Sequence, residues 1–355
     1  MGDDDLARGD ALCAAAAKKL RVRVNARPRA ARRRRGRRVD DSRDSIDAIR
    51  SMRSTRRIAR AFARGRLTRD ALQSHGFLSA ITGANRHEEA AELYERAATS
   101  FKLAKSWRRA ADAYEALATC RATTKETHDA ASAHVDCAQM LKKCGANEEA
   151  IGHYREASNA YARLGRLAQA AKHLKEIGET YESLGTAEGD ERAVEAFSSA
   201  ADLYDGEGDS GRTTGNNCKL KAATLLASKL DRFEEATEIF EDVGRASLNN
   251  NLLRFSVKGY FLQAGICRLC WNDAVGVLNA CERYEESDPA FASSRERDLL
   301  VNCAKAFEAG DQDAFSSAVA EFDSMSRLDG WKTTMLLKAK KRIVAAVEAE
   351  EDDLT

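Results

Sequence analysis

The residues of this chain best suited to chemistry are its nine cysteines and six histidines. Cys267 and Cys270 form a CxxC pair, but they lie in an apparent helix, Phe261 to Trp271, and no second ligand pair is near. We expect both thiols to pack as small apolar groups. The histidines (75, 87, 128, 134, 153, 173) show no HExxH spacing, and no GxxxxGK phosphate loop occurs. The sequence therefore predicts no enzyme activity, no cofactor and no metal.

The densest charge pattern lies at the end of the sequence. Five of the last eight residues are acids: Glu348, Glu350, Glu351, Asp352 and Asp353. Leu354 follows them, and an amphipathic segment, 331–348, precedes them. We expect this acidic tail (348–355) to be unstructured and to be presented to a basic partner, although its composition alone equally fits a solubilising role.

Basic residues are concentrated at the other end of the chain. Residues 1–75 hold 22 Lys and Arg against 9 Asp and Glu, whereas the remainder holds 35 against 47. Arginines gather in Arg32–Arg38, and segment 21–75 shows little apolar periodicity before Ile58. It reads as a disordered insert or gene-model artefact, a nuclear-localisation or nucleic-acid arm, or a transit peptide, although Asp3–Asp5 argue against the last. We assign it no function.

The overall composition indicates a soluble, helix-rich chain with a sizeable core. It is 43% hydrophobic and 32% charged, with only two prolines, Pro28 and Pro289. The odd cysteine count and the lack of a signal-type segment favour a reduced, cytoplasmic compartment. Because no run of about 18 apolar residues occurs, any membrane association is expected to be peripheral.

A sequence repeat that begins after Phe77 organises most of the chain. Aligned apolar stretches place an aromatic residue at Tyr114, Tyr154, Phe197 and Phe240, which is the spacing of a helical hairpin with its turns. Glycines mark the turns at Gly145, Gly165, Gly185 and Gly208. One stripe at helical spacing comprises Ala150, Ile151, Tyr154, Ala157, Ala160, Tyr161 and Leu164.

The predicted fold is all-α, a right-handed solenoid of TPR-like antiparallel helical hairpins capped by a C-terminal helical bundle. Helices are expected over 291–309, 311–325 and 331–348 in that bundle. The expected organisation is an N-terminal helix (1–20), the arginine-rich insert (21–75), the solenoid (76–286), the bundle (287–347) and the acidic tail (348–355).

Several long stretches resemble one family. Ser100–Trp107, Ser247–Lys258, Glu321–Leu337 and the acidic end Glu350–Thr355 closely resemble the α-type soluble NSF attachment protein family in its plant or algal form. The resemblance covers essentially residues 77–355. It implies a non-enzymatic adaptor: several copies coat an assembled SNARE four-helix bundle of the syntaxin type and recruit the hexameric ATPase NSF, which takes the bundle apart.

The resemblance also implies site residues. The apolar segment Gly76–Gly83 matches a membrane-touching loop, with Phe77, Leu78 and Ile81 as its candidates; by itself it equally fits a buried helix-entry staple. Glu350, Glu351, Asp352, Asp353 and Leu354 match the segment that binds NSF. Basic residues on the concave face would meet the acidic SNARE bundle, although each alone equally fits a solvated surface charge. They are Lys143, Arg166, Lys172, Lys221, Arg254 and Arg295, with Lys142 and Lys219 adjacent.

The chain departs from the family pattern at a few positions. Asn217 stands where a basic residue is expected, with Lys219 as a candidate substitute, and Lys305 and Ala309 stand where carboxylates are expected. Segment 21–75 separates the first helix from the membrane loop. The resemblance implies work at membranes of the secretory and vacuolar pathway without nucleic acid. The alternative is a TPR-like scaffold or co-chaperone adaptor unrelated to SNAREs.

Overall fold

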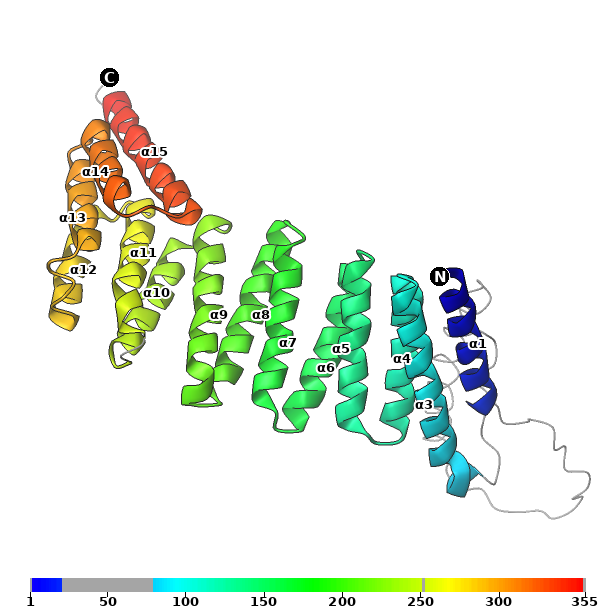
Figure 1. Ribbon diagram of the computed structural model, residues 1–355. Coiled ribbons are helices and arrows are strands. Elements are labelled where there is room, and N and C mark those ends of the chain that lie inside the picture. The colour runs from blue at the N-terminus through cyan, green and yellow to red at the C-terminus, as the bar shows by residue number, and fades with distance from the viewer. Residues whose placement is uncertain (1, 21–78, 251–252, 354–355) are drawn as a thin grey trace, which may run out of the picture. The chain divides into compact units, whose positions relative to one another are not determined.

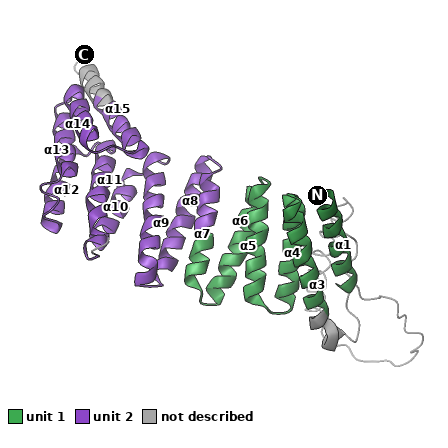
Figure 2. Cartoon of the chain, viewed as in Figure 1, with its two compact units in different colours: residues 1–173 green, residues 174–355 purple. Residues whose placement is uncertain are grey.

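The computed structural model describes residues 2–20, 79–250 and 253–353, with the backbone alone given for 79–85 and 344–353. All regular structure in these residues is helical, which confirms the predicted all-α class (Figure 1). Contacts divide the chain into two compact units, residues 1–173 and 174–355, and the boundary falls within one helix, α7 (Figure 2).

Unit 1 is a succession of helices in which each packs against the next. Its helices are α1 (Gly2–Leu20), α3 (Ser79–Leu103), α4 (Trp107–Thr123), α5 (Thr127–Lys143), α6 (Asn147–Arg163) and the first part of α7 (Leu167–Glu182). Alanines at the contacts, such as Ala110, Ala131 and Ala150, are fully or almost fully buried. Such small side chains let neighbouring helices approach closely. This packing is that of a helical-hairpin solenoid.

The helices of unit 2 also follow one another, but the last helix folds back onto an earlier one. Its elements after α7 are α8 (Ala187–Asp205), α9 (Asp209–Ser228), α10 (Phe233–Leu248), the 3₁₀ turn η1 (Arg254–Ser256), α11 (Val257–Cys270), α12 (Ala274–Ser287), α13 (Arg295–Glu308), α14 (Gln312–Met325) and α15 (Gly330–Asp353). The last helix returns to pack on α11. At the start of α15, Trp331 also contacts α10 and α9. Its ring centroid lies 5.6 Å from that of Phe240, and its Nε1 donates to the carbonyl of Thr224 at 3.4 Å.

The predicted repeat is confirmed at its aromatic positions. Tyr114, Tyr154, Phe197 and Phe240 are all buried. The turn glycines 145, 165, 185 and 208 have φ between 65° and 78°, the left-handed region that favours glycine. Lys105 and Lys125 adopt the same conformation, with φ of 55° and 63°, at equivalent turns that lack glycine. The glycine pattern alone therefore missed these turns.

Several detailed predictions were wrong. Leu164 was placed in the buried stripe, but it is the C-cap of α6 and is 43% exposed, because the helix ends there. The helix predicted over 291–309 begins at Arg295, since Ser294 caps it by accepting from the amide of Arg297. The acidic tail was expected to be unstructured, but the helix predicted to end at 348 continues to Asp353.

The two thiols of the CxxC pair lie in the core of unit 2, as predicted. Cys267 and Cys270 have no exposed surface, and Cys270 Sγ donates to the carbonyl of Met335 at 3.1 Å. Burial raises the pKa of both thiols, that of Cys270 to about 12. They are therefore protonated packing groups on α11.

Candidate functional site

The basic residues expected to meet an acidic partner divide equally between the two units. Unit 1 holds Lys142 and Lys143 in the last turn of α5, Arg166 in the turn before α7, and Lys172 on α7. Cations in a last turn interact favourably with the carbonyls that end a helix, so the sequence can carry Lys142 and Lys143 there without destabilising α5.

Aromatic rings orient two of the four candidate cations of unit 1. Lys143 Nζ lies 4.8 Å from the centroid of the Trp107 ring, and Lys142 Nζ lies 5.8 Å from that of Tyr154. A ring face orients an ammonium group without neutralising it. Arg166 is exposed, and its guanidinium donates a long hydrogen bond, 3.4 Å, to Gln169. Within the described part of the chain, no carboxylate pairs with Lys143, Arg166 or Lys172, so their charge is available to a partner.

The four candidate cations of unit 2 differ from those of unit 1, because three of them are already paired with a carboxylate from another element. Lys219 Nζ lies 2.7 Å from Asp205, and Lys221 Nζ lies 3.3 Å from Glu182. Arg254 lies 3.2 Å from the buried Asp288. These pairs reduce the net field of unit 2 and fix where its cations point.

The fourth cation of unit 2 is Arg295. It is exposed at the start of α13 and has no ion-pair partner among the described residues. Its charge is therefore available to a partner, as is that of Lys143, Arg166 and Lys172.

The helix geometry corrects the substitution suggested for Asn217. Residues two apart on a helix point about 200° apart, so Lys219 on α9 does not share the face of Asn217. Lys221, four residues after Asn217, does share it. A cation thus remains near that position, but it is Lys221.

The other two departures leave carboxylates nearby. Lys305 and Ala309, at the end of α13, line a groove of about 480 Å³. Asp311 and Glu321, at the start and within α14, line the same groove. Carboxylates are therefore present beside the positions where the family pattern led us to expect them, although other residues supply them.

The structure adds one candidate that we did not predict. Phe255 in η1 is 92% exposed, beside Arg254. Single exposed apolar residues are common on protein surfaces, so Phe255 is a candidate because it lies beside Arg254 and not because of its exposure alone. The asparagine run 249–251, which interrupts the helical pattern, was the signal that Phe255 lies in a connection and not in a core stripe.

The remaining candidates lie partly outside the described residues. Phe77 and Leu78 are outside them, and Ile81 falls on the backbone of α3, which begins at Ser79. The second half of the expected loop Gly76–Gly83 is therefore helical. At the other end, Glu350–Asp353 belong to α15, whereas Leu354 lies outside the described residues.

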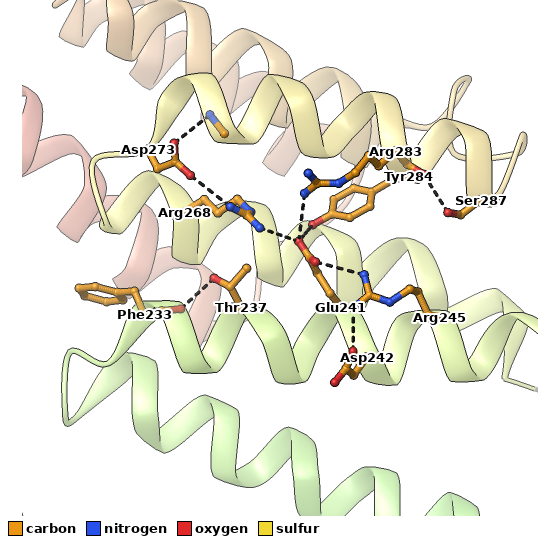
Figure 3. Close-up of polar contacts among 11 residues, drawn as sticks. Phe233, Thr237, Glu241, Asp242, Arg245, Arg268, Asp273, Arg283, Tyr284 and Ser287 are labelled. Atoms are coloured by element: carbon orange, nitrogen blue, oxygen red, sulfur yellow. Dashed lines mark hydrogen bonds and ion pairs between the residues drawn. The ribbon is translucent and has the colours of Figure 1, made fainter.

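Another group of ionisable side chains gathers around Glu241 (Figure 3). This carboxylate of α10 is 9% exposed and accepts from Tyr284 Oη at 2.7 Å, Arg268 at 3.0 Å and Arg245 at 3.2 Å. Arg268 also reaches Asp273 at 3.1 Å. Burial alone would raise the pKa of Glu241, but the hydrogen bonds from Tyr284 and Arg268 outweigh it and hold the pKa below its usual range. The cluster joins α10, α11 and α12, and both oxygens of Glu241 accept hydrogen bonds from these partners, so its role is structural.

The described residues lack two further features. They contain no helix long and apolar enough to cross a membrane. They also contain no group of three or more histidine, cysteine or acidic side chains that could hold a metal ion.

Comparison with known proteins identifies relatives. The profile of the family "Soluble NSF attachment protein, SNAP" matches residues 63–344. The match begins inside the arginine-rich segment 21–75 and ends before the acidic tail. The chain is 50% identical over 165 residues to an alpha-soluble NSF attachment protein of Vitis vinifera, which covers 46% of this chain and 56% of the relative.

Similarity extends to animals and fungi. The chain is 39% identical over 164 residues to an alpha-soluble NSF attachment protein of Mus musculus, with 46% of this chain and 53% of the relative covered. It is 40% identical over 163 residues to a probable vesicular-fusion protein, a sec17 homolog of Schizosaccharomyces pombe, with 46% and 54% covered. The chain thus spans about half the length of the curated relatives that it matches.

Proposed function

The chain belongs to the soluble NSF attachment protein family, and we propose that it is an adaptor that binds assembled SNARE complexes and recruits and stimulates the ATPase NSF. The ATP chemistry belongs to the partner, and this chain supplies binding surfaces. In vesicle fusion and intracellular protein transport such an adaptor returns SNAREs to the pool available for another round.

One observation supports SNARE binding above the others. Lys143 at the end of α5, Arg166 in the turn before α7, and Lys172 on α7 are exposed, and no carboxylate in the described residues pairs with them. Unpaired cations on a rigid helical surface attract an acidic partner and set its register. Arg254, Arg295 and the exposed Phe255 would add contacts from unit 2, and Phe255 would be covered on binding.

The acidic end carries the second half of the proposal. Glu350, Glu351, Asp352, Asp353 and Leu354 would engage the basic N-terminal domains of NSF. Acids at a helix C-terminus are unfavourable to the helix itself, because the terminal carbonyls are also negative. That cost is offset when a basic partner covers them.

Membrane contact is the third element. Phe77, Leu78 and Ile81 would touch the bilayer and place the protein peripherally on membranes of the secretory and vacuolar pathway. A few large apolar groups contribute about 1.5–3 kcal/mol each, which gives reversible attachment that several copies on one SNARE complex would strengthen.

NSF-driven disassembly of a purified SNARE complex tests the proposal. We would add the full chain or a version without residues 21–75, with NSF and ATP. Disassembly that depends on this protein supports the adaptor, and activity in both versions makes the arginine-rich segment dispensable. Activity in the shortened chain alone would mean that the segment blocks the membrane-loop end. If neither version supports disassembly, the TPR-like scaffold unrelated to SNAREs becomes the better account.

A further inference from the structure

The connection that carries Phe255 is weakly held to the rest of unit 2. None of the three residues of η1, Arg254–Ser256, is buried, although the turn lies against α10 and α11. Its backbone hydrogen bonds are local, for example from Arg254 N to Asn250 O at 2.9 Å. Among the described residues, only one side-chain hydrogen bond or ion pair leaves η1, and it joins Arg254 to Asp288 at 3.2 Å.

Asp288, by contrast, is rigidly built into the core. Its side chain is 2% exposed, and it ends α12 in an extended conformation, which the following Pro289 favours. Its carbonyl accepts from the amide of Phe291 at 2.7 Å. Phe291 is fully buried edge-on against Phe261 and Tyr284, with ring centroids 5.7 and 5.6 Å away.

A buried carboxylate in this position needs a partner. Asp288 Oδ1 accepts from the Arg254 guanidinium and, at 3.4 Å, from the amide of Ala290. The Arg254 side chain remains 53% exposed, so the same guanidinium can still reach a partner outside. An arginine has five donors in a fixed fork, and one bond to Asp288 leaves the others available.

We propose that Asp288 is a positioning residue for partner binding: through Arg254 it pins η1 and holds Phe255 outward in its binding orientation. The inference rests on the proposed function, since the partner in question is the acidic SNARE bundle. It adds a residue that does not itself touch the partner. Without the link, η1 would sample other conformations, and the apparent affinity would fall by the fraction of time spent in the competent one.

The test compares two carboxylate-to-amide substitutions in the full chain. Asp288→Asn breaks the buried link. Asp205→Asn, the matched control, breaks the exposed pair with Lys219, whose side chains are 43% and 35% exposed. Both remove one negative charge, so long-range attraction to an acidic bundle predicts slightly tighter binding for both. If Asp288 positions η1, the two variants should differ in SNARE binding. Asp288→Asn should bind about tenfold more weakly if η1 holds its binding conformation about one-tenth of the time, whereas Asp205→Asn should bind equally or more tightly.

Two further measurements separate positioning from a general loss of structure. Amide hydrogen exchange of residues 249–257 should quicken in Asp288→Asn while the α11 core stays protected. In a background that carries both Phe255→Ala and Arg254→Gln, adding Asp288→Asn should weaken SNARE binding little further. Equal or tighter binding by Asp288→Asn, or unchanged exchange, would overturn the proposal. If Asp288→Asn does not fold, the exposed Arg254→Gln breaks the same link and should give the same faster exchange.

The hydrogen-exchange result can be interpreted whether or not the proposed function is correct. If the wild-type chain binds no SNARE complex, the adaptor proposal fails. The exchange measurement still decides whether Asp288 pins η1: faster exchange supports the link, and unchanged exchange refutes it.

Discussion

Among single residues, the state of each charged group depends on its neighbours more than on its type. Lys143 keeps its charge available over the Trp107 ring, whereas Lys219 shares its charge with Asp205. Glu241 accepts from three side chains in a nearly dry site, and Arg268 needs that carboxylate to offset its own partial burial. Substitutions at these groups should therefore differ widely in effect.

The first prediction concerns Glu241→Gln. It removes the charge that Arg268 and Arg245 share, so we expect a loss of about 3 kcal/mol in the free energy of unfolding. Urea unfolding at neutral pH measures it. Glu238→Gln, an exposed change on the same helix, should stay within about 0.5 kcal/mol of wild type. Equal stability of the two variants would show that the cluster contributes nothing.

The same carboxylate makes stability depend on acid. Because the pKa of Glu241 in the folded protein lies below its usual 4.5, its contribution is complete above about pH 4.5 and is lost as the pH falls through the folded value. The wild type should therefore approach the stability of Glu241→Gln in strong acid.

A second prediction at the scale of single residues concerns His134 on α5 and His153 on α6, whose rings lie against each other. Their Nδ1 atoms are 3.0 Å apart, so the hydrogen bond needs at least one of them unprotonated. Burial lowers the pKa of both, and His153 further lowers that of His134, although Glu115, Glu149 and Glu156 oppose the shift. Since the folded pKa values lie below 6.5, the stabilisation is present above that pH and is lost as the pH falls.

Replacing one ring should reduce this acid sensitivity. We expect His153→Gln to lose less stability than the wild type between about pH 7.5 and about pH 5.5, the range in which histidine titrates. Chemical unfolding at both values checks this. An exposed residue that does not titrate serves as the control, and Gln139→Ala on α5 should leave the pH dependence close to that of the wild type. Identical losses in wild type and His153→Gln would contradict the prediction.

Individual helices were the most predictable feature, because their signals are local. Apolar spacing and turn glycines predicted the hairpin repeat, and the burial of Tyr154 and Phe240 confirms two of its four aromatic positions. Where helices meet was not predictable, since close approach depends on residues far apart in the sequence. Gly244 on α10 is one such contact, facing Phe261 of α11.

A pair of glycine substitutions tests this contact. A Cβ at Gly244 would lie 2.7 Å from the Phe261 ring, which is fully buried and cannot move aside. We expect Gly244→Ala to destabilise the protein by about 1–3 kcal/mol. Gly259→Ala, also within a helix but with open space around it, should stabilise by about 0.5–1 kcal/mol. Thermal unfolding of both variants decides, and a neutral Gly244→Ala would mean that the helices can separate.

At the scale of the whole molecule, the proposed function is divided along the chain. The cations proposed to bind SNAREs are spread over both units, whereas the candidate ATPase contact is confined to the end of α15 and the residues after it. Two activities that use separate residues should be separable by mutation.

Leu354→Ala tests this separation. We expect SNARE binding to be unchanged and NSF-driven disassembly to slow by roughly tenfold or more, because burial of a leucine contributes about 1.5–3 kcal/mol. Pull-down and disassembly assays on the same sample measure the two. Thr355→Ala should behave as the wild type. Unchanged disassembly by Leu354→Ala would remove this leucine from the NSF contact.

The sequence by itself determined the all-α class, the hairpin repeat and those of its turns that carry glycine, because helical periodicity and glycine turns arise among residues close in the chain. The resemblance supplied the candidate surfaces residue by residue. Only the tertiary structure decided which cations are paired, that Phe255 is exposed, that Asp288 supports Arg254, and that α15 packs on α11. These facts depend on side chains from distant segments meeting, and burial and charge pairing exist only once the helices have packed.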